Sequence, residues 1–282
     1  MHRVTASWIL AAALACATPA AAHEPLHSQI DGLTGEIAAA PDRAGLYLER
    51  AELLRLDGQP QRAEADLATA ERLRPGEPAI ALCRAEMLRD AGRLIAARRA
   101  LDALLARSPA LAPARALSAE VYVALGRTGE AIADLDSAIA RSRRRTPELY
   151  LELARLLSGR RDLARSLASV EEGVRACGPS PALEDFAVDL EVELGRPDSA
   201  LARLDSMMAL APRRANLLAR RGDILLAAGR ELEAGVAYSQ GLAEIEALPP
   251  YKRRAAATAA LEERLRAALR SHPQAPASRT TP

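Results

Sequence analysis

Glycine returns at a fixed interval along most of this chain. Gly58, Gly92 and Gly126 follow one another 34 residues apart, and the same interval separates Gly195 from Gly229. Glycine makes up only about 7% of an average protein, so chance does not explain this spacing. A period of this length indicates that one structural unit is repeated. We therefore expect an array of similar units rather than a fold built around one closed core.

Small and apolar residues keep the same period. A small residue recurs once per unit, and a larger apolar residue follows it four positions later. The small residues are Ala63, Ala97, Ala131, Ser166, Ala200 and Ala234, and the larger ones are Leu67, Leu101, Leu135, Val170, Leu204 and Tyr238. Each unit predicts two helices of about a dozen residues, which are marginal alone and carry one apolar stripe that only a neighbour can cover. Aromatic residues make up only 2% of the chain, which disfavours a β-sandwich or barrel.

The period and the small residues resemble those of the tetratricopeptide repeat family. The resemblance covers residues 44–248 as six repeats, with one extra residue within 141–145. The repeats begin at Ala44, Pro78, Ala112, Pro147, Pro181 and Ala215. The resemblance implies an all-α fold, a right-handed α-solenoid of helix-turn-helix repeats, in which small residues at the eighth, twentieth and twenty-seventh places let the two helices of a repeat approach closely.

Three features depart from the family pattern. The first-helix tryptophan and the Leu-Gly pair are mostly absent, and only Tyr47 and Tyr150 are aromatic at the fourth place. Repeat 4 has Gly159 rather than a turn glycine in register. Repeat 5 has Glu191 where a large apolar residue is usual. These differences weaken the assignment of repeats 4 and 5 individually, but not the assignment of the array.

Residues 1–22 are interpreted as a signal peptide. An apolar stretch from Val4 to Ala17 precedes Ala20, Ala21 and Ala22, which predicts cleavage after Ala22 and export to the periplasm or the extracellular space. The stretch is shorter than the roughly 18 residues expected of a membrane span. An alternative is a lipid anchor at Cys16, because residues 14–16 resemble the end of a bacterial lipobox, although Ala13 stands where that motif prefers leucine.

The segments that flank the repeats are expected to cap the array. Leu26, Ile30, Leu33 and Ile37 lie at helical spacing and predict an N-terminal capping helix within residues 23–43. Residues 249–271 predict a C-terminal capping helix, of which Tyr251–Arg270 is the alanine-rich part. Residues 272–282 are interpreted as a disordered tail.

Charge and motifs favour a binding function over catalysis. The 38 basic residues nearly balance the 37 acidic ones, so no net charge attracts the chain to nucleic acid. No phosphate loop, nucleophile elbow or catalytic triad is present in the sequence, so neither an enzyme nor a cofactor is expected. The hypothesis is a non-catalytic protein-interaction module of the cell envelope. The alternative is a scaffold that associates with itself; its oligomeric state is open.

The resemblance also predicts where a partner would bind. Family members bind peptides or helices along a concave face formed by the second, fifth, ninth and twelfth places of the first helices. The candidate residues here are Leu48, Glu52, Arg55, Leu82, Glu86, Arg89, Glu120, Leu151, Arg155, Asp189 and Asp223. Carboxylates recur at the ninth places, which favours a basic or mixed polar partner. The alternative is that these acids are solvated and pair along their own helix, such as Glu52 with Arg55 and Glu86 with Arg89.

Two further candidates are weaker. His23 would be the new N-terminus after cleavage, and together with His27 it could bind copper or zinc, although an exposed, unliganded pair is the stronger interpretation. Cys83 and Cys177 fall at non-equivalent repeat positions and are interpreted as small hydrophobic residues rather than a disulfide. The arginine-rich segment 141–145 is interpreted as a solvated loop between repeats.

Overall fold

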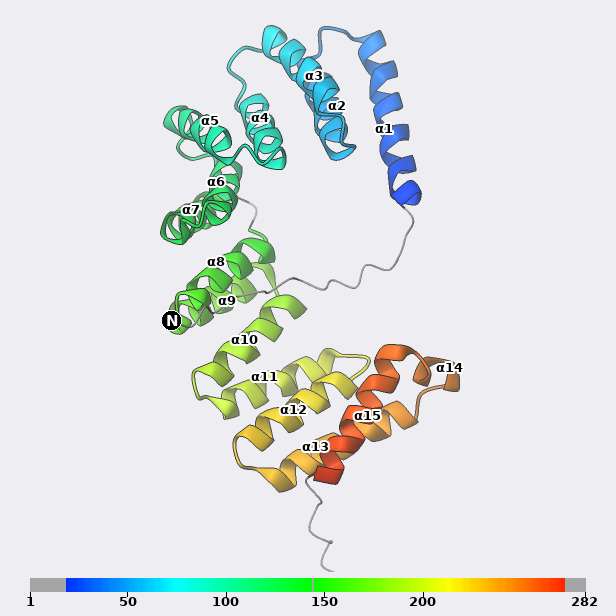
Figure 1. Cartoon of the computed structure of the whole chain (residues 1–282). Helices are drawn as coiled ribbons and strands as arrows, with labels where there is room; N and C mark the ends of the chain where they lie inside the picture. Colours follow the sequence, from blue (N-terminus) through cyan, green and yellow to red (C-terminus); the bar gives the residue numbers. More distant parts are fainter. Residues whose placement is uncertain (1–18, 144, 272–282) are drawn as a thin grey trace, which may run out of the picture. The chain divides into compact units, whose positions relative to one another are not determined.

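The computed structural model describes residues 19–143 and 145–271, with side chains from residue 26 onward, and this part of the chain is built from α-helices without a strand (Figure 1). The apolar part of the predicted leader, Cys16 and the tail 272–282 lie outside the described residues. None of the helices in residues 19–143 and 145–271 combines the length and hydrophobicity that a membrane span requires.

Helices begin at each of the six positions where the sequence predicts a repeat. The first helices of the repeats are α2 (Ala44–Leu56), α4 (Pro78–Asp90), α6 (Ala112–Ala124), α8 (Pro147–Gly159), α10 (Pro181–Glu193) and α12 (Ala215–Ala227). The second helices are α3 (Pro60–Leu73), α5 (Leu94–Arg107), α7 (Thr128–Arg141), α9 (Leu163–Cys177), α11 (Pro197–Leu210) and α13 (Glu231–Glu246). Proline at the first turn of many of these helices suits its fixed φ and missing N–H.

The helices form two compact units, residues 1–134 and residues 135–282, and the boundary between them falls inside α7. In the first unit, α1 (Pro19–Ala39) packs against α2, α2 pairs with α3, and α4 pairs with α5, which also contacts α6. In the second unit, successive helices from α8 to α13 pack against one another and α15 (Ala256–Ser271) covers α13. The expected all-α solenoid is confirmed, and its right-handed superhelix stays a prediction.

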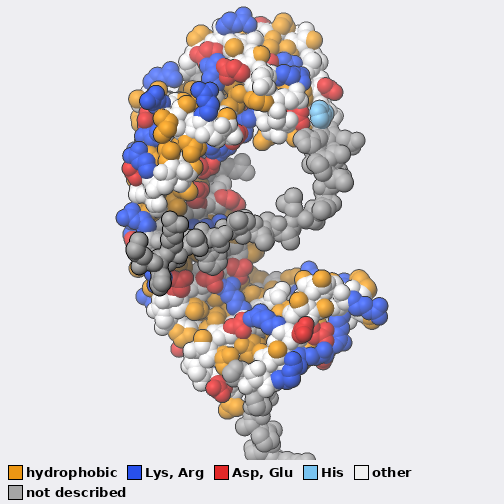
Figure 2. All heavy atoms as spheres, in the orientation of Figure 1, with side chains coloured by type: hydrophobic (Ala, Val, Ile, Leu, Met, Phe, Trp, Pro, Cys, Tyr) orange, Lys and Arg blue, Asp and Glu red, His pale blue; other side chains and the backbone are white. Residues whose placement is uncertain are grey.

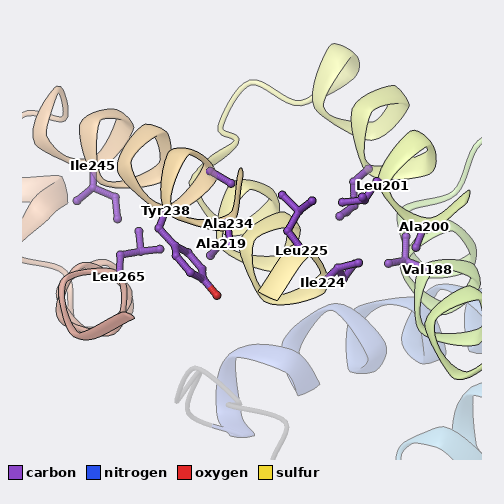
Figure 3. Close-up of a cluster of buried hydrophobic side chains, with 12 residues drawn as sticks. Val188, Ala200, Leu201, Ala219, Ile224, Leu225, Ala234, Tyr238, Ile245 and Leu265 are labelled. Atoms are coloured by element: carbon purple, nitrogen blue, oxygen red, sulfur yellow. The ribbon is translucent and has the colours of Figure 1, made fainter. Parts of the chain in front are cut away.

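Small residues allow the helices of each repeat to approach. The eighth places are occupied by Ala51, Ala85, Ala119, Ala154, Val188 and Gly222, and the twentieth places by Ala63, Ala97, Ala131, Ser166, Ala200 and Ala234; all twelve are buried. In Figure 3, Ala219 and Ala234 lie where α12 meets α13, among the larger side chains of the same core. Burial of these apolar surfaces against the neighbouring helices is the main stabilising contribution to such an array.

Two glycines provide space for tyrosine rings. A Cβ at Gly222 of α12 would come within 2.3 Å of the ring of Tyr238 on α13, and a Cβ at Gly173 of α9 would come within 2.8 Å of Tyr150 on α8. Both tyrosines are buried, and Tyr238 lies beside Leu265 of α15 in Figure 3. The glycines at these two places are therefore required by packing.

The periodic glycines end the first helices. Gly58 has φ +73°, and its N–H donates to the carbonyl of Arg55, while the N–H of Gln59 donates to the carbonyl of Leu54. This pair of bonds is a Schellman motif, in which a left-handed residue satisfies the last carbonyls of the helix. The same two bonds and a positive φ occur at Gly92, Gly126, Gly195 and Gly229. In repeat 4 the position belongs to Arg161, which adopts φ 64°.

The terminal helices differ in part from the sequence expectation. α1 begins at Pro19 and therefore includes the predicted cleavage position after Ala22; its Ile30 and Ile37 are buried against the first repeat. The C-terminal segment was expected to form one helix over Tyr251–Arg270, but this is wrong. It forms the short α14 (Pro250–Arg253) and then α15, because Arg254 and Ala255 make a turn between them.

Candidate interaction surface on the first helices

The predicted binding residues lie on the first helices, and their exposure divides them into three groups. Glu52, Glu120, Arg155 and Asp189 are exposed. Leu48, Arg55, Leu82, Glu86, Arg89 and Asp223 are half-buried. Leu151 is only 8% exposed, so its assignment to a binding face is wrong: in α8 the fifth place contributes to the core. We call the fifth, ninth, twelfth and thirteenth places of the first helices the first-helix surface.

Arg55 connects the first helix of repeat 1 to that of repeat 2. Its guanidinium Nη1 donates to the Asp90 carboxylate at 2.6 Å, and its Nη2 lies 3.3 Å from the Glu86 carboxylate. Burial raises the pKa of Glu86, and the nearby Arg55 and Arg89 offset this only in part. Burial alone would also raise the pKa of Asp90, but hydrogen bonds from the same two arginines outweigh it and lower this pKa. The acids at this junction are therefore held by arginine from the preceding repeat.

Arg89 of repeat 2 pairs with the next first helix in the same way as Arg55 of repeat 1. Its Nη1 donates to Glu120 on α6, and its Nη2 donates to Asp90 at 2.8 Å. The alternative interpretation, in which Glu52 pairs with Arg55 and Glu86 with Arg89 along one helix, is therefore wrong. Each arginine extends instead to the following repeat, because adjacent first helices lie side by side and place the twelfth place of one next to the ninth place of the next.

Glu52 is different from the other carboxylates of α2, α4 and α6 on this surface. It is exposed, and within residues 26–143 and 145–271 no hydrogen bond or ion pair involves it. Leu56, one turn further along α2, is 58% exposed. At the start of the array, the first-helix surface therefore offers an acid without a cationic partner next to an exposed leucine.

In the second unit Arg220 pairs in the opposite direction along the chain. Arg220 of α12 donates to the carboxylate of Asp185 at 2.9 Å and to that of Asp189 at 2.6 Å, both on the preceding first helix. Asp223 accepts a hydrogen bond from the hydroxyl of Tyr238 at 2.9 Å and another from Arg264 of α15. These acids are thus neutralised by arginine within the same unit.

Arg155 is the exposed cation that remains on this surface of the second unit. It occupies the ninth place of repeat 4, where the other repeats have an acid, and no ion pair involves it in the described part of the chain. Val192 on α10 is 40% exposed at the twelfth place. Most of the carboxylates predicted at the ninth places are therefore paired with arginine. Two ninth-place charges of opposite sign have no partner among the described residues: Glu52 in one unit and Arg155 in the other.

The structure also contains buried ion pairs that the sequence analysis did not identify. Arg50 donates two hydrogen bonds of 2.7 Å to Asp66, which is 6% exposed. Arg253 binds Glu262, which is 7% exposed. Asp66 lies at the twenty-third place of repeat 1, and Arg203 of α11, which pairs with a buried acid of α10, lies at the same place of repeat 5. This place is on the side of a second helix that faces its first helix. A charged residue at that place is the signal that could have predicted such pairs.

The described residues do not provide a set of ligands for the metal site predicted at His23 and His27. The side chain of His23 lies outside them, and Nε2 of His27 lies 3.4 Å from the Asp57 carboxylate. Residues 26–143 and 145–271 contain no group of three or more histidine, cysteine, aspartate or glutamate side chains that could hold a metal ion. Cys83 and Cys177 are both free thiols, and burial raises the pKa of Cys83 to about 12.

A hollow lies in the second unit, lined by residues of α11, α12 and α13. Its volume is about 890 Å³, and its lining includes Met208, Leu218 and Gln240. Arg214 and Glu244, which form an ion pair at 2.6 Å, are also among its lining residues. On the face that Figure 2 shows, acidic and basic side chains are interspersed with apolar ones rather than gathered into one patch. The face in this view is therefore mixed in charge.

Comparison with known proteins gives the fold. No protein-family model and no curated protein matches the sequence. Solved structures do match. The C-terminal part of a TPR repeat-containing protein from Cytophaga hutchinsonii has a TM-score of 0.61 at 13% identity, over 79% of this chain and 92% of the other. PilF of Pseudomonas aeruginosa has a TM-score of 0.53 at 14% identity, over 68% and 87%.

A third similar structure is a chain of the APC/C hetero-tetramer Cut9–Hcn1. It has a TM-score of 0.50 at 15% identity over 87% of this chain, which spans only 48% of that one. At these identities the likeness concerns the fold alone. Together with the internal period and the helix pairs, it identifies the chain as a helical repeat array of the tetratricopeptide type.

Proposed function

We propose that this array of tetratricopeptide-type repeats is a non-catalytic interaction module that binds a protein or peptide partner on its first-helix surface. The observation that carries the proposal is the occurrence on that surface of two uncompensated charges, Glu52 in one unit and Arg155 in the other, and of exposed apolar side chains in each unit. Leu56 is 58% exposed, and Val123 and Val192 are about 40% exposed. Charge that is not neutralised internally provides specificity, and exposed apolar area provides binding energy.

Only some of the predicted site residues are available to a partner. Glu86, Glu120, Asp189 and Asp223 stabilise contacts between neighbouring helices, so we assign them to the integrity of the array rather than to direct recognition of a partner. Replacing Glu52, Glu86 and Glu120 together would change both the contacts between helices and the surface that a partner binds, so the two effects could not be separated. Charge reversal at Glu52 or at Arg155 alone changes the surface without removing an ion pair between the described residues.

Site-specific photo-crosslinking tests the location of the partner site. A photoreactive amino acid is placed at Leu56 or Val123 on the first-helix surface, and at the exposed Ala68 on α3 as the matched control. We expect a discrete crosslinked product from the first two positions in the native envelope fraction and none from Ala68. Equal products from all three positions, or a product from Ala68 alone, would contradict this assignment. Mass spectrometry of the product identifies the partner.

The proposed location is outside the cytoplasm, in the periplasm or the extracellular medium. The support is the sequence pattern of residues 1–22, with Cys16 as the lipid-anchored alternative. Mass spectrometry of the mature N-terminus separates the two, since cleavage after Ala22 leaves His23 first and lipidation leaves a modified Cys16 first. An unprocessed Met1 would contradict both.

Two alternative functions remain as proposals. A self-associating scaffold would use the exposed Leu232 and Val236 of α13, which lie one turn apart and are 63% and 50% exposed. Light scattering over a concentration series tests it, because a mass that stays monomeric contradicts it. A metal carrier using His23 and His27 is tested by copper titration of protein with a verified His23 terminus, against protein extended by one residue.

A further inference from the structure

In the first unit, the same contact between an arginine and a glutamate of successive first helices occurs twice. The arginine at the twelfth place of repeat 1, Arg55, contacts the ninth-place acid of repeat 2, Glu86. The arginine at the twelfth place of repeat 2, Arg89, contacts the ninth-place acid of repeat 3, Glu120. In both cases a guanidinium from one first helix lies against a carboxylate on the next. The ninth place in this unit is therefore a position that accepts arginine.

Glu52 occupies the ninth place of repeat 1, but the described chain has no earlier first helix to provide its arginine. The only described helix before α2 is α1, and its side chains beside repeat 1 include Ile30 in the core, Thr34 beside Arg50 and His27 beside Asp57. None of these reaches Glu52, which is exposed and makes no ion pair among the described residues. The row of arginine-to-acid contacts thus begins with a carboxylate whose position lacks the usual cation.

We propose that Glu52 binds an arginine side chain of a partner polypeptide, in the way that Glu86 and Glu120 bind Arg55 and Arg89. Leu48 and Leu56 lie one turn before and one turn after Glu52, and they pack against apolar residues that flank this arginine in the partner. The inference rests on the proposed function, since it names the chemistry of a partner that the first-helix surface binds. It extends to the partner a contact that the array already makes with itself.

Charge complementarity supports this choice of occupant. On α2, α4 and α6 the surface carries four acids, Glu52, Glu86, Asp90 and Glu120, against two arginines, Arg55 and Arg89. One further cation at Glu52 would complete the row. Arginine suits the position better than lysine because its planar fork can form two parallel hydrogen bonds with one carboxylate and can lie over neighbouring apolar surface. Leu56, at the place that Asp90 occupies in the next repeat, provides such a surface.

Selection from a library of short random peptides displayed on phage tests the inference with the whole protein as bait. We expect arginine to be enriched in the selected peptides, next to apolar residues. Binding of the best peptide should fall by about tenfold in Glu52→Gln, as expected for the loss of a charge-assisted contact. The matched control is Glu49→Gln, an exposed acid on the same helix that does not occupy a ninth place. Circular dichroism checks that both variants keep their helicity.

A charge swap separates this inference from the proposed function. Replacing the peptide arginine by citrulline should cost about as much as Glu52→Gln, and the two changes together should cost no more than either alone, as in a coupled pair. A peptide with glutamate in place of that arginine should bind the Glu52→Arg variant better than it binds the wild type.

If peptides bind but show no arginine preference, or if Glu49→Gln and Glu52→Gln weaken binding equally, the inference fails while the proposed function stands. If no peptide is selected, or if selected peptides bind a variant with both Glu52→Arg and Arg155→Glu unchanged, both fail.

Discussion

Arg203 on α11 holds Glu191 on α10 through two hydrogen bonds, 3.1 Å from Nε and 2.7 Å from Nη2. Its Nη1 donates a third bond of 2.8 Å to Glu184. Glu191 is only 4% exposed, at a place where the repeat normally needs a large apolar residue. These hydrogen bonds, foremost that to Glu191, raise the pKa of Arg203 above its ordinary value. The guanidinium therefore makes a buried acid acceptable inside repeat 5.

Removing the arginine alone should be costly. Arg203→Met leaves Glu191 buried without a cation, and loss of one partner of a buried pair typically destabilises a protein by about 3–5 kcal/mol. We expect a decrease of this size in the free energy of unfolding, measured by urea denaturation. The double variant Glu191→Leu with Arg203→Met restores an apolar pair and should recover most of the loss. A double variant as unstable as Arg203→Met would contradict the account.

Gly222 should not tolerate a side chain. In Gly222→Ala the new Cβ would collide with the ring of Tyr238, and overpacking of a core typically costs about 1–3 kcal/mol. The matched control is Gly35→Ala on α1, where a Cβ meets nothing within 4 Å. Alanine is favoured over glycine inside a helix by about 1 kcal/mol, so the control should stabilise slightly. Thermal unfolding midpoints of the two variants should move in opposite directions.

Arg161→Gly should stabilise repeat 4. Arg161 adopts φ 64°, in the left-handed region that costs a residue with a side chain roughly 1–2 kcal/mol and costs glycine nothing. Its ion pair with Glu193 spans 3.5 Å between exposed groups and contributes little. We expect the urea midpoint to rise in this variant and to fall in Gly126→Ala, where φ is +73°. A lower midpoint for Arg161→Gly would show that the contacts of the arginine side chain stabilise the fold by more than its left-handed backbone conformation costs.

Stability should decrease in alkali through Tyr238. Burial and the hydrogen bond to Asp223 raise the pKa of Tyr238 to about 12, above the ordinary value of about 10. The folded state therefore holds this proton more tightly than the unfolded state does. The resulting stability is complete below about pH 10 and is lost as the pH rises through about 12. Urea midpoints measured over this range should fall less in Tyr238→Phe, and parallel curves for the two proteins would contradict the assignment.

The two cysteines of the repeats should differ in reactivity. Cys83 is 1% exposed and its pKa is raised to about 12 by burial and by Glu86 and Glu52, so it carries almost no thiolate near neutral pH. Cys177 is half-buried at the end of α9. We expect iodoacetamide to modify Cys177 in the native protein and Cys83 only after unfolding. Labelling of the single variants Cys83→Ser and Cys177→Ser, followed by mass spectrometry, assigns each product.

The candidate site was predicted only in part. The spacing of the repeats was sufficient to place Glu52, Arg55, Glu86 and Arg89 on the first helices, because residues at fixed offsets in a helix share a face. The spacing did not indicate with which acid each arginine would form an ion pair. Arg55 could pair with Glu52 on its own helix or with Glu86 on the next, and only the packing of adjacent first helices favours Glu86. The burial of Leu151 depends in the same way on its neighbours.

The period, the helix pairs and the places where backbones approach could be predicted from the residues alone, since these depend on glycine, alanine and proline at regular offsets. The sequence could not determine how charge is distributed between structure and surface. Ion pairs between adjacent first helices join residues 31 to 35 positions apart, such as Arg89 with Glu120 and Arg220 with Asp185, and no local pattern encodes them. The packing of the helices shows that most of the described acids are neutralised within the array, whereas Glu52 and Arg155 have no partner among the described residues. The physical reason is that a carboxylate is neutralised by whichever guanidinium the packed helices bring within hydrogen-bonding distance.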